Sequence, residues 1–189
     1  DTLSHVLALI YPHIAKAELG IQIDTNQFFD VEDFVKAYDV NGINAPLNCE
    51  FLHRESEISE TYNSVNDNKV TILTGASGIG KTRLALEGCR KKDEEEVKVY
   101  CIKSNGNLLY EDIKYYISDP GKYLIFFDDA NMVASLDNVL NTILTLSGDY
   151  EVKVLITVRD YAQDRVISSV SKYVQPNIIE IERFEDDEI

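Results

Sequence analysis

The stretch VTILTGASGIGKTRLALEG, residues 70–88, decides how the rest of the chain is interpreted. An apolar run breaks into three glycines within six positions, and a lysine, a threonine and a helical pattern follow. Gly75, Gly80, Lys81 and Thr82 match GxxxxGK[ST], a loop whose backbone N–H groups surround phosphate oxygens. Glycines suit such a loop because they adopt backbone angles that side chains forbid and let amides approach an anion closely. We therefore expect this stretch to bind a polyphosphate.

The residues of the loop have distinct expected roles. Lys81 is expected to contact the β- and γ-phosphates, and the Thr82 hydroxyl to bind Mg²⁺. The partial positive charge of the helix that opens at Gly80 points at the same place. A glycine-rich turn without a ligand is the alternative, and the apolar strand before the loop and the helix after it argue against that alternative. The expected nucleotide-binding residues of the loop are Gly75, Ala76, Ser77, Gly78, Ile79, Gly80, Lys81, Thr82 and Arg83.

From residue 69 onward, short β-rich runs alternate with helical segments that have one apolar face. Continuous apolar strands that alternate with helices are typical of a parallel sheet covered on both faces. We therefore predict an α/β fold, a three-layer domain with a mostly parallel five-stranded sheet, preceded by a small helical segment. The expected strands are 69–74, 97–102, 122–129, 152–158 and 177–182, and the expected helices are 80–91, 108–117, 134–147 and 161–173.

Charged residues follow two further strands at their carboxyl ends, where parallel sheets bind ligands. In YLIFFDDA we expect Asp128 to hold the hydrated Mg²⁺ and Asp129 to orient or deprotonate the attacking water. A solvated turn is the alternative for the two aspartates taken alone. Arg159 ends the strand VLITVR and is expected to contact the γ-phosphate, whereas a surface ion pair with Asp160 or Asp164 is the alternative. The expected catalytic residues are Lys81, Asp129 and Arg159, and the expected Mg²⁺ ligands are Thr82 and Asp128.

Composition and charge exclude several classes of protein. The net charge of −15 opposes binding to nucleic acid and to anionic lipid. The apolar runs are too short to span a bilayer, and no secretory signal is recognisable. The three scattered cysteines fit reduced thiols in the cytoplasm and argue against disulfides or a zinc site. The [NT]KxD segment of GTP-specific proteins is missing, so ATP is the expected nucleotide. We expect a cytoplasmic protein whose segment binds neither nucleic acid nor membrane.

Residues 1–48 do not follow the alternating pattern. The stretch 2–19 is helical in pattern but interrupted near Pro12, and residues 31–40 predict a second, short helix. We expect residues 1–48 to form a separate helical segment and residues 49–189 to form the nucleotide-binding domain, truncated at its C-terminal end. Both ends of the sequence look cut, which suggests a piece of a longer polypeptide.

Together, these motifs resemble the STAND class of P-loop NTPases, the signal-transduction ATPases with numerous domains. GASGIGKTRLALE looks like the STAND form of the phosphate loop, YLIFFDDA is similar to its hhhhDD motif, and LITVRD looks like its arginine-bearing sensor strand. Upstream, FLHRESEI (51–58) resembles the hhGRExE motif that opens STAND ATPase domains, with His53 where the family has glycine. The match covers about residues 51–189 and looks most like the novel bacterial STAND branch, which includes antiphage sensors.

The resemblance implies a role for Arg54 at the adenine end of the pocket, whereas helix-entry pairing with Glu57 or Glu60 is the alternative. It implies ATP and Mg²⁺ as cofactors, and an effector domain before the ATPase, with residues 1–48 as its remnant or linker. It also implies a sensor region that binds a trigger such as a phage protein. Binding of the trigger would permit ATP-driven homo-oligomerisation in defence or signalling, with hydrolysis that is slow or activated by a partner.

Two other functions stay open at this point. A small P-loop phosphotransferase, similar to a nucleoside kinase, suits the length, and VRDYAQDR offers two arginines for a phosphate lid. It would need an acceptor pocket and a mobile lid, and neither has a recognisable segment. A scaffold that binds nucleotide without turnover is the second alternative, and the intact Lys81, Thr82, Asp128 and Asp129 count against it.

Overall fold

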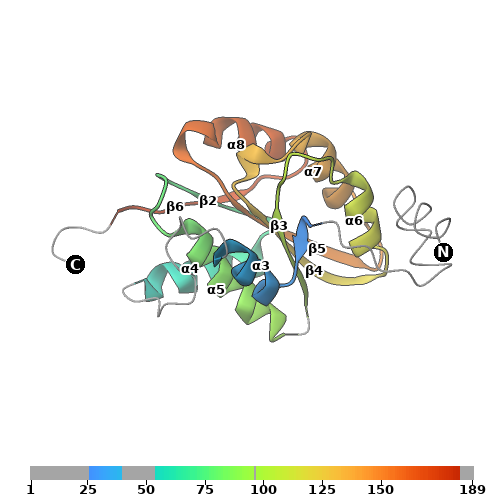
Figure 1. Cartoon of the computed structure of the whole chain (residues 1–189), viewed down its shortest axis with the longest axis horizontal. Coiled ribbons are helices and arrows are strands. Elements are labelled where there is room, and N and C mark those ends of the chain that lie inside the picture. The colour runs from blue at the N-terminus through green and yellow to red at the C-terminus, as the bar shows by residue number, and fades with distance from the viewer. Residues whose placement is uncertain (1–25, 40–53, 96, 184–189) are drawn as a thin grey trace.

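The computed structural model describes residues 26–39, 54–95 and 97–183. Its centre is a six-stranded sheet in the order β1-β3-β4-β5-β2-β6 (Figure 1). Strands β2 to β6 are parallel, and β1 pairs antiparallel with β3 at one edge. The strands are β1 (Phe28–Phe29), β2 (Val70–Thr74), β3 (Lys98–Lys103), β4 (Gly121–Asp128), β5 (Tyr150–Thr157) and β6 (Asn177–Glu180).

Helices cover both faces of the sheet. Figure 1 shows α6, α7 and α8 on one side and α3, α4 and α5 on the other. Successive strand side chains point to opposite faces, so that Phe126 belongs to the core under α3 and α5, and Phe127 to the core under α6 and α7. The helices are α3 (Val31–Asp39), α4 (Glu55–Asp67), α5 (Lys81–Asp93), α6 (Tyr110–Tyr116), α7 (Leu136–Leu144) and α8 (Gln163–Ser171), with 3-10 turns η2 (Ala130–Met132) and η3 (Asp160–Ala162).

The predicted three-layer α/β fold is confirmed, and each of the five expected strands and four expected helices is present within a few residues of its predicted bounds. The sheet has six strands rather than five, because Phe28 and Phe29 pair with Ile102 and Cys101. Two residues carry no alternation pattern, so pairing with a distant strand decides this element rather than local sequence. The helix expected over residues 31–40 is α3.

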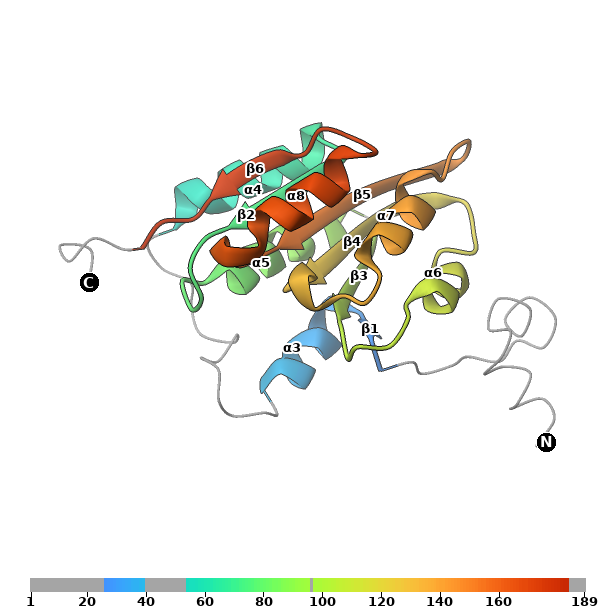
Figure 2. The same cartoon turned by 90° about the horizontal axis from the view of Figure 1, so that it is seen from above.

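Residues 26–39 pack on this sheet. Phe34 of α3 is fully buried, and the centre of its ring lies 5.8 Å from the centre of the Phe126 ring in β4. Figure 2 shows α3 and β1 together at the β3 edge of the sheet. The helix expected over residues 2–19 and the boundary expected near residue 48 lie outside the described residues. No helix in the described parts of the chain is long and apolar enough to cross a membrane.

The strand order determines where the functional loops meet. Strand β5 lies between β2 and β4, and all three run in the same direction. The loop after β2, the aspartates at the end of β4 and the arginine after β5 therefore share one edge of the sheet. Parallel sheets bind ligands at this carboxyl edge.

Candidate nucleotide site

The loop between β2 and α5 depends on its glycines. Gly75, Gly78 and Gly80 all have positive φ, at 139°, 81° and 96°. A Cβ atom on Gly75 would lie 2.5 Å from the Ile181 carbonyl oxygen and 2.6 Å from Cδ1 of Ile79. Only glycine therefore fits where the start of the loop passes the chain that leaves β6.

Helix α5 begins at this loop with its first N–H groups available for an anion. Its N-cap residue, Gly80, is left-handed and supplies no side-chain cap. The first N–H groups of a helix have no acceptor within the helix, and the helix dipole adds partial positive charge there. A phosphate group would supply the missing acceptors, so this local structure fits the polyphosphate that the motif predicts.

Lys81 is held inside the curve of the loop. Its side chain is buried, and Nζ donates hydrogen bonds to the carbonyl oxygens of Gly75 at 2.8 Å and Ala76 at 2.6 Å. Burial lowers the pKa of Lys81, and the nearby Asp129 carboxylate opposes that shift. The chain thus keeps an ammonium group out of water, which costs free energy unless an anion compensates it.

Three hydrogen bonds link Thr82, at the end of the loop, and Thr157, at the end of β5, to the two aspartates. The hydroxyls of Thr82 and Thr157 both donate to Oδ1 of Asp128, at 2.8 and 2.9 Å. The backbone N–H of Asp129 donates to the Thr157 hydroxyl at 2.9 Å. Burial raises the pKa of Asp128, and the two threonine hydrogen bonds lower it. The sequence pattern does not single out Thr157, although a threonine inside the apolar run VLITV is the signal that could have found it.

Thr82 and Asp128 supply the hard oxygen ligands that Mg²⁺ prefers. The described parts of the chain contain no group of three or more histidine, cysteine, aspartate or glutamate side chains placed to hold a metal ion. A bound Mg²⁺ would therefore need oxygens from phosphate and water besides those of Thr82 and Asp128. Phosphate-bound Mg²⁺ in nucleotide sites is typically held in this way.

Asp129 and Arg159 form an ion pair. Asp129 is left-handed, with φ of 48°, and stands at the start of η2. Arg159 donates to Oδ2 of Asp129 from Nη2 at 2.8 Å and from Nε at 3.2 Å. The arginine thus pairs with the expected water-activating carboxylate rather than with Asp160 or Asp164, the partners of the surface alternative. The side chain of Arg159 is 40% exposed and that of Asp129 is 31% exposed, so a bound ligand or water could contact both.

Arg54 joins the start of α4 to the segment that follows β6, beside the loop. The side chain is buried at the start of α4, where Nη1 donates to Glu57 at 2.8 Å and Nη2 to the carbonyl oxygen of Glu182 at 2.9 Å. The contact with Glu57 is the helix-entry pairing that the sequence leaves as an alternative. Ile181, next to Glu182, is the residue that lies against Gly75. The role of Arg54 at the adenine end stays a prediction.

Arg83 lies on α5, where Nε donates to Glu87 at 3.1 Å.

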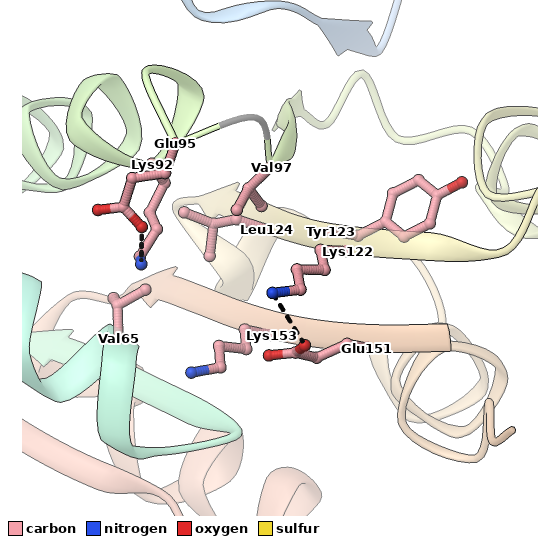
Figure 3. A pocket seen from close by; sticks show the side chains of 9 residues that line it. All are labelled: Val65, Lys92, Glu95, Val97, Lys122, Tyr123, Leu124, Glu151 and Lys153. Carbon is pink, nitrogen blue, oxygen red and sulfur yellow. Dashed lines mark hydrogen bonds and ion pairs between the residues drawn. The ribbon is translucent and has the colours of Figure 1, made fainter. Parts of the chain in front are cut away.

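A lysine-lined hollow of about 110 Å³ lies at the opposite, amino end of β4 and β5 (Figure 3). Its ammonium groups have acceptors within the chain, because Lys92 pairs with Glu95 at 2.6 Å and Lys122 with Glu151 at 3.9 Å. The Lys153 ammonium donates to the backbone carbonyl of Asn66. We assign this hollow no part in the nucleotide site.

Several solved structures are similar in fold to this chain. The Hsp104–ADP complex of S. cerevisiae matches with a TM-score of 0.57 at 13% identity, over 84% of this chain and 25% of that one. The Aeropyrum pernix Orc1 protein in complex with DNA matches with 0.56 at 14% identity, over 86% and 52%. The Thermotoga maritima RuvB Holliday junction branch migration motor matches with 0.53 at 15% identity, over 74% and 50%. The chain thus spans between a quarter and about half of these proteins, and the likeness shows the fold.

No curated protein matches the chain. The family model described as Novel STAND NTPase 3 matches residues 52–188, which is more than half of the chain and includes the loop, both aspartates and Arg159. The glycine loop, the two aspartates and the arginine thus occur together in a P-loop fold and in the family predicted from them, and the chain belongs to the novel STAND NTPase 3 family.

Proposed function

We propose that this domain binds ATP with Mg²⁺ at the loop of residues 75–82 and hydrolyses it, and that the nucleotide state switches the assembly of the whole protein. The observation that carries the proposal is the hydrogen-bonded group of Thr82, Asp128, Thr157 and Asp129 beside the buried Lys81. It supports the proposal because it brings a hydroxyl, two carboxylates and an ammonium group together at the carboxyl edge of the sheet.

Each of these residues has a chemical task in the proposed reaction. Lys81 and the N–H groups at the start of α5 would bind the β- and γ-phosphate oxygens and balance their charge. Thr82 and Asp128 would hold Mg²⁺, which polarises the phosphoryl oxygens. Asp129 would orient the attacking water and accept its proton.

The ion pair between Asp129 and Arg159 supports slow turnover in the resting protein. Two N–H groups of the guanidinium donate to Oδ2 of Asp129, so this oxygen is occupied and not available to an attacking water. If Arg159 moved to the γ-phosphate, Asp129 would become free to act on water. We infer that hydrolysis is slow, or waits for a partner that favours this rearrangement.

Family membership supports the wider proposal. We infer that a sensor region binds a trigger, such as a phage protein, and that ATP then drives homo-oligomerisation in defence or signalling. Because residues 26–39 pack on the sheet, the part of residues 1–48 that precedes β1 would contribute the linker from an effector domain. The acidic net charge of −15 opposes binding of this segment to nucleic acid.

The test is phosphate release from ATP and Mg²⁺ by the full-length protein, with Lys81→Ala as the inactive control and light scattering to follow assembly. We expect slow phosphate release that Lys81→Ala abolishes, because the polyphosphate loses its charge partner. Transfer of the phosphate to a small acceptor would instead indicate a phosphotransferase. Tight retention of ATP without turnover would indicate a scaffold, and unchanged ATP affinity in Lys81→Ala would refute the loop assignment.

A further inference from the structure

The segment that follows β5 is held against the end of β2 and the start of the phosphate loop by hydrogen bonds. The N–H of Val158 donates to the Leu73 carbonyl oxygen at 3.0 Å. The N–H of Asp160 donates to the Gly75 carbonyl oxygen at 3.3 Å. These two bonds flank Arg159 in the sequence, so the backbone of Arg159 is fixed on both sides.

Gln163, the first residue of α8, adds a side-chain contact to the same place. The hydroxyl of Thr74, the last residue of β2, donates to Oε1 of Gln163 at 2.5 Å. Thr74 is 2% exposed, so its hydroxyl cannot readily exchange this acceptor for water. Helix α8 packs beside β2 (Figure 2), and this bond fixes the start of the helix next to the loop.

A short turn connects this contact to Arg159. Residues 160–162 form η3, and the N–H of Ala162 donates back to the carbonyl oxygen of Arg159 at 2.9 Å. The turn is thus attached to the start of the loop at both ends, by the Asp160 N–H at its first residue and by the Gln163 side chain just after its last. With its backbone fixed, Arg159 can exchange one anionic partner for another by rotation of its side chain alone.

We propose that Gln163 is a positioning residue for recognition of the γ-phosphate, and that it acts by holding the η3 turn, and Arg159 before it, against the phosphate loop. The inference rests on the proposed function, in which Arg159 leaves Asp129 for the γ-phosphate of ATP. A turn that is already ordered loses less conformational entropy when the arginine contacts the phosphate, so the bond between Thr74 and Gln163 favours ATP. ADP has no γ-phosphate, so its affinity does not depend on this bond.

The variant Gln163→Met tests this, because methionine keeps an unbranched side chain of similar length and is only a weak acceptor. Binding of ADP and of a non-hydrolysable ATP analogue to the full-length protein is measured by calorimetry in Mg²⁺. We expect the ratio of ATP-analogue affinity to ADP affinity to fall about three- to fivefold, the factor that about one hydrogen bond contributes, with ADP affinity within about twofold of wild type. Thr74→Val removes the donor of the same bond and should give the same result.

Thr71→Val serves as the control for Thr74→Val. Thr71 lies on the same strand, and its hydroxyl shares a hydrogen bond of 2.7 Å with Ser64 of α4, away from the loop. This variant should keep the wild-type ratio of affinities. Arg159→Ala shows whether Gln163 acts through the arginine, because the addition of Gln163→Met to Arg159→Ala should not lower the ratio further.

A wild-type ratio in Gln163→Met would overturn the proposal, as would an equal loss of affinity for both nucleotides, which would show a general structural role. A further fall of the ratio in the double variant would also overturn it, because Gln163 would then act independently of Arg159. If the wild type bound both nucleotides equally well, this inference would fail while nucleotide binding by the loop would stand. If the wild type bound neither nucleotide, the proposed function itself would fail, and this inference with it.

Discussion

Valine in place of Thr157 would remove one hydroxyl from the centre of the site and keep the branched shape of the side chain. Thr157 is 1% exposed, and its hydroxyl both donates to Asp128 and accepts from the N–H of Asp129. A hydrogen bond to a charged group contributes about 1.5–3 kcal/mol and a neutral one about 1 kcal/mol. Since Thr82 still donates to Asp128, we expect Thr157→Val to lower the free energy of unfolding by about 2–3 kcal/mol.

Thr71→Val is the matched control for this change. Thr71 of β2 is also fully buried, and it shares a hydrogen bond of 2.7 Å with Ser64 of α4, away from the loop. Both partners are neutral, so its loss should cost only about 1 kcal/mol. The difference between the two variants in urea unfolding isolates the contribution of the charged partner of Thr157.

We expect the two variants to differ more in their rate of ATP hydrolysis than in their stability. Thr157 holds the backbone of Asp129, whose left-handed conformation needs support from its surroundings. Small misplacements of a catalytic group can cost about 100-fold in rate, so we expect Thr157→Val to release phosphate at least about tenfold more slowly at saturating ATP and Mg²⁺. Thr71→Val should keep the wild-type rate. A Thr157→Val protein as active and as stable as Thr71→Val would refute the reasoning.

Three further changes test other parts of the site. Gly75→Ala should lose ATP binding and at least about 2 kcal/mol of stability, because its Cβ would overlap the Ile181 carbonyl. Gly106→Ala is the control, since Gly106 also has a positive φ but open space around it, and it should lose less stability. Equal urea midpoints for the two variants would contradict this. Arg159→Ala should blunt discrimination between ATP and ADP, and a wild-type ratio of the two affinities would make Arg159 a surface residue. Burial lowers the pKa of Lys81 below its ordinary value of 10.5. Between the lowered pKa and 10.5 the unfolded chain binds more protons than the folded chain, so the free energy of unfolding rises with pH. Lys81→Met should lack this rise, and the same pH dependence of unfolding in the variant and the wild type would show that the ammonium is not desolvated.

Local signals in the sequence were sufficient for the sheet and the loop. Apolar runs such as YLIFF are buried on both faces, so their composition reports their place in a parallel sheet directly. The glycines of the loop are required by the backbone geometry itself, as the contact between Gly75 and Ile181 shows. Features of this kind can be predicted because the cause lies within a few residues of the effect.

Long-range contacts could not be predicted in this way. Thr157 reaches the site only because β5 lies beside β4. A threonine in a strand is an ordinary residue until that neighbour is known. The partner of Arg159 is a similar case, since Asp160 and Asp164 are nearer in sequence than Asp129.

The pairing of Asp129 with Arg159 gives the proposed switch a physical basis. Oδ2 of Asp129 accepts two guanidinium N–H groups, so this oxygen is not available to an attacking water while the ion pair is closed. A γ-phosphate carries more charge than a carboxylate and would compete for the arginine. ADP lacks that group, so the ion pair would persist with ADP and open with ATP. In the proposed function, the same exchange of partners would both sense the γ-phosphate and prepare Asp129 to remove it, and sensing and hydrolysis would then not be separable by mutation of Arg159 alone.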